Sequence, residues 1–218
     1  MSQWRFLMVN PQLMHYLETT IIPQYKQFDT SHSPEHVYQV LENSIEIAAP
    51  LSVDLDIAST VAVFHDLGLL KGRKNHERAS RSMVESDAFL ADYFTKEQRK
   101  IIGEAVEDHR ASLSYEPRSI YGKIISEADR DLDFYRILER TIYFAIEKKS
   151  LSDPDNLCQE AFEYIQQKYG PHHHLTFWLG YSKNIAGLAE IHEMLTDPIK
   201  FNSAFSDCYE QRMKKPTS

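Results

Sequence analysis

The sequence predicts an all-α fold, a single-domain helical bundle that spans residues 1–218. Three observations favour this fold: the chain has only seven glycines in 218 residues, apolar residues recur at helical spacing from residue 11 to residue 195, and no segment alternates as a strand would. The length suits one large domain or two small ones. No internal repeat or low-complexity tract argues against a single domain.

Proline, glycine and capping residues divide the first half of the chain into helices. Pro23 ends or bends the first helix, and Ser33 before Pro34 is typical of an N-cap followed by proline at the first helical position. The stretch from Thr95 to Gln98 reads as a capping box. The helices expected here cover residues 11–25, Pro34 to Pro50, Asp54 or Asp56 to Gly68, His76 to about Val84, and Thr95 to His109.

The second half continues the helical pattern. One apolar face runs from Tyr121 to Leu132, and we expect the helix to continue to Lys148. A turn at residues 152–155 precedes a helix that opens with residues 161–165 and continues until Gly170 and Pro171 break it. The segment from Leu175 to Leu195 is again apolar at helical spacing, and residues 214–218 are expected to fray. These C-terminal helices, residues 135–213, are expected to cover a site or to shape substrate choice.

The composition narrows the functional class. The formal net charge is −8, from 24 Lys and Arg against 32 Asp and Glu. This charge disfavours non-specific nucleic-acid binding, and a small anionic substrate would need a locally positive site. The two cysteines form no disulfide framework, no apolar run approaches the ~18 residues of a membrane span, and the N-terminus lacks a signal-peptide pattern. We therefore expect a cytoplasmic protein that does not bind membranes.

Several imidazoles and carboxylates fall on or beside the inward faces of separate helices. Burying such groups costs free energy unless a partner compensates, and the pattern contains no inward Lys or Arg that would do so. One inward histidine is usually a hydrogen-bonded core residue, but a group of them in a bundle favours a metal site. The residues of this pattern are His36, His65, Asp66, His76, His109 and Asp129.

The order of these residues resembles the HD superfamily of metal-dependent phosphohydrolases. The resemblance covers about residues 29–134 and rests on three stretches: Ser31-His32-Ser33-Pro34-Glu35-His36-Val37, Phe64-His65-Asp66-Leu67-Gly68 and Glu127-Ala128-Asp129-Arg130. Two further histidines, in Asn75-His76-Glu77 and Asp108-His109-Arg110, look like the added ligands of the dinuclear subset. The stretch Asp129-Arg130-Asp131-Leu132-Asp133 departs from the Asp-Arg-Leu-Asp of many relatives, which leaves open the register after Asp129.

The resemblance implies a divalent metal centre with one or two ions per chain, from among Mn, Fe, Mg, Ni, Co and Zn. It implies that His36, His65, Asp66 and Asp129 hold one ion. His76 and His109 would hold a second ion, with Asp66 as the bridge and as the central catalytic residue. We expect His32 to assist proton transfer or to orient a ligand. Substrate phosphate would be met by basic residues next to these ligands, namely Lys71, Arg73, Lys74, Arg110 and Arg130.

The reaction implied is hydrolysis of a small phosphomonoester or phosphodiester, with a nucleotide favoured, by attack of a metal-activated water. Two alternatives stay open: a catalytically silent metal-binding sensor or regulatory module, and a structural bundle with core histidines. The oligomeric state is also open, and a homo-oligomer is one alternative. Three features are weaker. The run His172-His173-His174 is expected to lie in a loop or to cap a helix, and His192-Glu193 lacks the second histidine of a zincin motif. The aromatic residues Phe177-Trp178 and Tyr181 are expected to belong to the core or to a dimer face.

Overall fold

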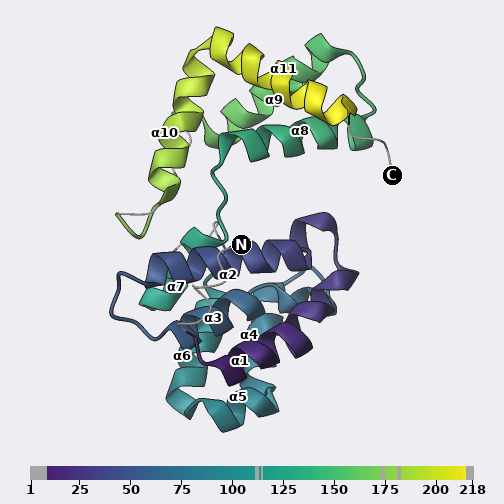
Figure 1. The fold of residues 1–218 in the computed structure, drawn as a ribbon. Helices are drawn as coiled ribbons and strands as arrows, with labels where there is room; N and C mark the ends of the chain where they lie inside the picture. Colours follow the sequence, from purple (N-terminus) through teal and green to yellow (C-terminus); the bar gives the residue numbers. More distant parts are fainter. Residues whose placement is uncertain (1–8, 111–112, 114, 173–174, 181–182, 215–218) are drawn as a thin grey trace. The chain divides into compact units, whose positions relative to one another are not determined.

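The structure, a computed structural model, describes residues 9–214 except 111, 112, 114, 173, 174, 181 and 182 (Figure 1). Its described part is helical and contains no strand, which confirms the all-α prediction. The α-helices are α1 (Pro11–Tyr16), α2 (Pro34–Ala48), α3 (Leu55–Phe64), α4 (His76–Ser86), α5 (Ala88–Tyr93), α6 (Lys96–Glu107), α7 (Ile120–Ala128), α8 (Phe134–Lys149), α9 (Pro154–Tyr169), α10 (Lys183–Thr196) and α11 (Pro198–Lys214).

The chain divides into two compact units, unit 1 (Met1–Arg130) and unit 2 (Asp131–Ser218). Unit 1 contains α1 to α7, and unit 2 contains α8 to α11. The sequence predicts that the metal-site core ends at residue 134, which is four residues after the last residue of unit 1. That all 218 residues form a single domain stays a prediction.

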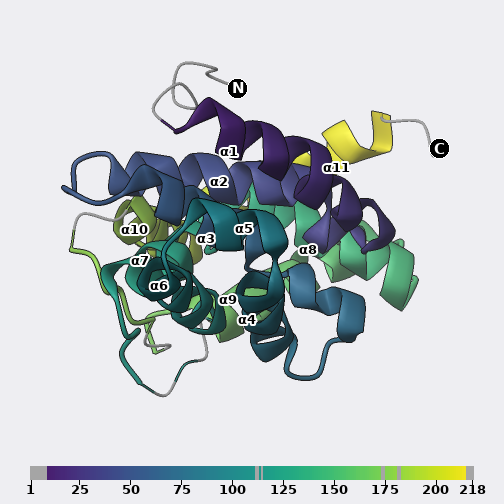
Figure 2. The same cartoon turned by 90° about the horizontal axis from the view of Figure 1, so that it is seen from below.

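Helix α3 is the central helix of unit 1. It packs against α2, α4, α6 and α7, and both views draw it between α2 and α6 (Figures 1 and 2). Every residue from Ile57 to Phe64 is buried, because the sequence of this helix is apolar or small on all sides and a helix of that kind must be surrounded. The residues that follow α3 therefore emerge in the interior of unit 1.

Three predicted helix starts are confirmed. Asp54 caps α3 with its carboxylate, and Thr95 and Gln98 form the predicted capping box of α6. Ser33 occupies the N-cap of α2 with Pro34 after it, but its side chain makes no capping hydrogen bond. His36 therefore lies in the first turn of α2, as the pattern predicted.

The predicted helix across Asp129 was wrong. Helix α7 ends at Ala128, residues 129–133 are not helical, and α8 begins at Phe134. The break follows from Asp133, whose carboxylate accepts a hydrogen bond from Arg136 N and caps the new helix, as aspartate does at an N-cap. The break leaves Asp129 at the end of one helix rather than inside a longer one.

Other helix bounds also differ from the prediction. Asp153 caps α9, so this helix starts at Pro154 and not near residue 161, and α10 starts at Lys183. The first segment continues past α1 as a π-helix, η2 (Leu17–Ile21), and a 3-10 helix, η3 (Ile22–Gln27). Pro23 has no N–H to donate to a regular helical ladder. This accounts for the change from the π-helix to the 3-10 helix at Ile22.

Unit 2 has its own apolar core. Helices α8 to α11 bury residues from each helix, including Phe134, Leu157, Ile191 and Phe201. In Figure 1, α10 runs steeply across the direction of α8. None of the helices in the described ranges is long and apolar enough to cross a membrane.

Candidate metal centre

The centre begins where α3 ends. His65 is the C-cap of α3, and Asp66 leaves the helical path with φ −107° and ψ 4°. Both side chains are buried: His65 is 0% exposed and Asp66 is 5% exposed. Tyr25, also fully buried, donates a hydrogen bond of 2.8 Å to the carbonyl of Val63 in the last turn of α3. The apolar helix therefore delivers an imidazole and a carboxylate into the interior.

Three histidines share one way of being held. Each has its Nδ1 close to the carbonyl oxygen three residues earlier, so that Nδ1 is the protonated nitrogen. The distances are 2.7 Å from His65 to Ala62, 3.1 Å from His76 to Arg73 and 2.7 Å from His109 to Val106. This leaves the Nε2 lone pair of each ring free to bind a cation, and backbone carbonyls commonly orient metal-binding histidines in this way.

The two carboxylate oxygens of Asp66 face different histidines. Oδ1 lies 3.1 Å from His76 Nε2 and 3.4 Å from His109 Nε2, whereas Oδ2 lies 3.3 Å from His65 Nε2. The Nε2 atoms of His76 and His109 are themselves 3.3 Å apart. Asp66 therefore has the geometry of a bridge between two groups of ligands.

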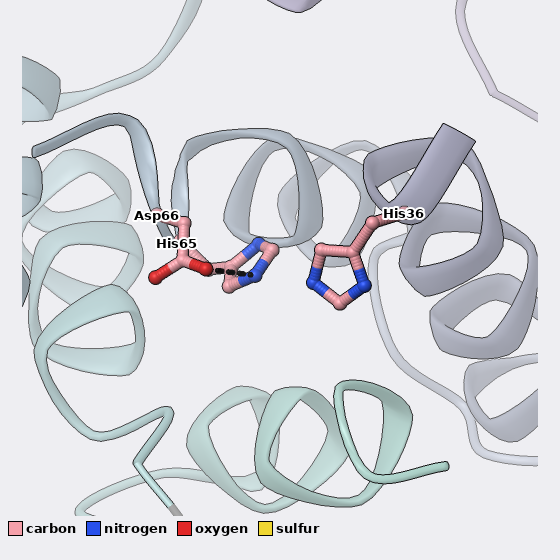
Figure 3. A group of neighbouring side chains, drawn as sticks. All are labelled: His36, His65 and Asp66. Atoms are coloured by element: carbon pink, nitrogen blue, oxygen red, sulfur yellow. Dashed lines mark ion pairs between the residues drawn. The ribbon is translucent and has the colours of Figure 1, made fainter. Parts of the chain in front are cut away.

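His36 and Asp129 complete the other side of the centre. His36 reaches from α2 toward the ring of His65, and their ring centroids are 5.5 Å apart (Figure 3). Asp129 Oδ1 lies 3.2 Å from His36 Nε2 and 3.6 Å from His65 Nε2. The six residues that the sequence pattern singled out therefore lie together, although they come from five separate segments.

The charges in the centre are strongly coupled. Burial would raise the pKa of Asp66, but the charge of His65 and the close imidazoles of His109 and His76 hold this pKa well below its usual range. Burial would lower the pKa of His65, yet the charges of Asp66 and Asp129 outweigh it and raise the pKa to about 9. Burial also opposes ionisation of Asp129, and the hydrogen bond from His36 and the charge of His65 lower its pKa.

The donor set fits divalent cations. Two groups of ligand atoms are close enough to hold an ion, one from His36, His65 and Asp66 and the other from Asp66, His76 and His109. Within the described residues, the buried Nε2 of His65 has no hydrogen-bond partner. A buried ring nitrogen that faces two carboxylates is costly to leave without a partner, and a metal cation between them would satisfy all three. Imidazole and carboxylate are suitable ligands for first-row divalent metals.

The backbone of His76 packs closely against Gly68, in the turn that follows His65 and Asp66 (the HD turn). A Cβ on Gly68 would lie 2.0 Å from the carbonyl oxygen of His76, and Gly68 N donates a hydrogen bond of 2.7 Å to the buried hydroxyl of Ser80. The linker before α4 turns at Gly72 and Asn75, which both have positive φ. Glycine adopts this backbone region freely and asparagine more readily than most residues. The local sequence therefore allows α4 to start beside Asp66.

Sequence reasoning missed several residues that support the ligands. Asn43, buried and two turns after His36, donates a hydrogen bond of 2.9 Å to the carbonyl of Ala128, directly before Asp129. Its position on the inward face of α2 was a signal that could have identified it.

Asp108 and Arg118 were also missed. Asp108 is fully buried, accepts hydrogen bonds from Arg118 N, Nε and NH2, and directly precedes His109. These bonds tie the end of α6 to the residues before α7 and so fix the position from which His109 projects. The partner of Asp108 could not be read from the sequence, because ten residues separate the two side chains.

The predicted catalytic and phosphate-binding residues occupy different surroundings. His32 Nε2 lies 3.8 Å from Asp66 Oδ2, at the edge of the centre. Arg73 is paired with Asp29, and Arg110 NH1 lies 3.7 Å from Glu77 Oε1. Lys71, Arg73, Lys74 and Arg110 are exposed, and Arg130 is half-buried beside Asp129. Their contact with a substrate phosphate stays a prediction.

The other features that the sequence drew attention to belong to unit 2. His172 is exposed, while His173, His174 and Tyr181 lie outside the described residues. His192 Nε2 is 2.8 Å from the carbonyl oxygen of Tyr169, and this hydrogen bond gives the histidine a structural partner. Within the described residues, both groups that could hold a metal lie in unit 1.

Comparison with known proteins gives one finding. The HD domain family matches residues 35–132, a span that contains all six residues of the centre. The searches of curated proteins and of solved structures found no match. The matched span begins one residue before His36, ends three residues after Asp129 and lies almost entirely within unit 1. Residues 35–132 of this chain therefore match the HD domain family, the family that the order of histidines and aspartates resembles.

Proposed function

We propose that this protein is a metal-dependent phosphohydrolase that cleaves a small phosphomonoester or phosphodiester. The observation that carries the proposal is the position of Asp66, whose two oxygens face separate groups of histidines. This arrangement suits two divalent ions that share one carboxylate. A nucleotide is the favoured substrate by the resemblance to HD phosphohydrolases.

The roles of the side chains follow from their positions. Asp66 would hold both ions, His36, His65 and Asp129 would complete one ligand set, and His76 and His109 would complete the other. When bound, two such ions supply Lewis acidity toward a phosphate oxygen and lower the pKa of a water. The Nδ1 hydrogen bonds fix the tautomer and the orientation of these imidazoles, so that Nε2 faces the centre.

The charge balance supports an anionic substrate. The ligand set has two carboxylates, Asp66 and Asp129, and its other members are histidines, which bind an ion as neutral imidazoles. Two divalent cations held there would leave the centre with a net positive charge. A protein with an overall charge of −8 would then attract phosphate at this place and repel it elsewhere.

Elemental analysis and a substrate panel together test the proposal. Protein purified without chelator should contain about two divalent ions per chain, and it should hydrolyse members of a panel of phosphomonoesters and phosphodiesters in the presence of Mn²⁺. Removal of the ions by a chelator should abolish turnover, and added Mn²⁺ should restore it. Comparing nucleotides with phosphosugars in the same panel tests the substrate preference.

The two alternatives give different results in the same assays. A structural bundle would contain no stoichiometric metal. A metal-binding sensor would contain metal but would turn over none of the panel, and this result would contradict the proposed hydrolysis while leaving the metal centre in place.

A further inference from the structure

His32 is held differently from the three histidines whose Nδ1 contacts a backbone carbonyl. Its Nδ1 lies 2.8 Å from the carboxylate oxygen Oδ1 of Asp29. Its Nε2 faces Asp66 Oδ2 at 3.8 Å, yet His32 belongs to neither group of ligand atoms that could hold an ion. The His32 side chain is 22% exposed, so a small molecule approaching the centre from solvent can reach this ring.

Asp29 is itself fixed by other contacts. Its Oδ1 also accepts a hydrogen bond of 3.0 Å from Ser31 N, which makes Asp29 the N-cap of the 3-10 turn η4 (Thr30–His32). Its Oδ2 is bound by Arg73 NH2, from the linker between the HD turn and α4. The hydrogen bond from His32 lowers the pKa of Asp29, so this carboxylate stays ionised near neutral pH. Both oxygens of Asp29 are therefore engaged in holding one geometry.

We propose that Asp29 is a positioning residue that fixes the His32 ring with Nε2 directed to the substrate side of the centre, and that Arg73 supports Asp29 rather than binding phosphate. The inference rests on the proposed function, because it assigns His32 to contact a phosphate oxygen of the substrate. An imidazole with no partner at Nδ1 turns about its side-chain torsions. Misplacing a reacting or contacting group by about 1 Å can cost on the order of a hundredfold in rate.

A double-mutant cycle tests whether Asp29 acts through His32. Asp29→Ala and His32→Ala should each lower kcat by about ten- to a hundredfold, the loss typical of an orienting partner. The double variant should be no slower than His32→Ala alone, because the two residues act as one unit. KM and metal per chain should change little in all three variants. Asp29→Asn keeps an oxygen acceptor for Nδ1–H and should recover most of the lost kcat.

A second readout does not depend on turnover. The imidazole ¹⁵N signals of His32 should report a hydrogen-bonded Nδ1–H in the wild type, and Asp29→Ala should remove this signature. Asp153→Ala is the matched control, because Asp153 is also an exposed N-cap aspartate, with a hydrogen bond of 2.9 Å from Asn156 N, but in unit 2. It should leave kcat and the His32 signals unchanged.

Additive losses in the double variant would overturn the inference, since they would mean that Asp29 and His32 act independently. Loss of metal in Asp29→Ala would also overturn it, by showing that Asp29 only maintains the fold before α2. If the wild type hydrolyses no phosphate ester, the proposed function fails. In that case the His32 signals still decide whether Asp29 holds the ring.

Discussion

Units 1 and 2 are built from the same kind of element but differ in what their helices bury. In unit 2, the buried polar residues within the described ranges are Thr141 and Asn184, and the Thr141 hydroxyl donates within its own helix to the carbonyl of Ile137. In unit 1 the buried polar and charged set is larger: Asn43, Ser44, Ser59, Thr60, His65, Asp66, Ser80, Asp108, His109, Ser126 and Glu127.

This difference indicates where function resides. Burying ionisable groups opposes folding unless partners compensate, so a core that contains His65, Asp66 and His109 is not arranged for stability alone. The core of unit 2, from Leu132 to Cys208, is almost entirely apolar in its described residues. We therefore expect substitutions in unit 1 to change metal binding and activity, and equivalent substitutions in unit 2 to change stability.

The largest effect should come from Asp66→Ala. The variant loses the carboxylate that faces both groups of histidines, and we expect it to bind no ions and to have no detectable hydrolysis. The fold should survive, because a buried charge is removed rather than added. Elemental analysis, circular dichroism and the substrate assay measure the three outcomes. Full metal content in this variant would mean that the centre has been assigned to the wrong residues.

Phe201→Ala should produce the opposite result. Phe201 is 1% exposed in the core of unit 2 and packs edge-to-face against Phe134 and Phe162. Its truncation should lower the free energy of unfolding by about 3–5 kcal/mol, measured by urea denaturation. Metal per folded chain should stay as in the wild type. A folded Phe201→Ala protein without metal would remove the distinction between the two units.

His109→Ala should have a smaller, partial effect within unit 1. His109 contacts only the Oδ1 side of Asp66, so its loss should reduce the metal content from about two ions to about one. The rate should fall by about 10–100-fold rather than vanish, because one ion still activates water. Metal content and kcat are compared with those of His36→Ala, which should disturb the other ion. One ion in the wild type, unchanged in His109→Ala, would indicate a mononuclear centre.

The smallest effect is expected for His173→Ala. The run of three histidines at residues 172–174 resembles a metal-binding motif, but among the described residues, which do not include His173, both groups that could hold an ion lie in unit 1. This variant should match the wild type in metal content and in kcat. A large loss of metal or of kcat would place part of the functional centre in unit 2. This result would contradict the assignment of metal binding and activity to unit 1.

The sequence by itself determined the helical class and the members of the candidate centre. Helical spacing and the absence of strand alternation identify an all-α chain, because side-chain period is a local property of the backbone. The order of His36, His65-Asp66 and Asp129 identified the HD domain, and the residues of the capping box at Thr95 marked a helix start to the residue. Helical spacing and the capping box are each complete within a short stretch of chain, and the HD pattern consists of short motifs whose order can be read along the chain.

Only the tertiary structure decided which atoms face one another. The sequence named Asp66 as a bridge, but the assignment of Oδ1 to His76 and His109 and of Oδ2 to His65 depends on how α3, α4 and α6 pack. The break after Asp129 was missed because helical spacing continues across it, while capping by Asp133 ends the helix. The pairing of Arg73 with Asp29 joins residues 44 positions apart. Such contacts arise from packing between distant segments, and no local pattern encodes them.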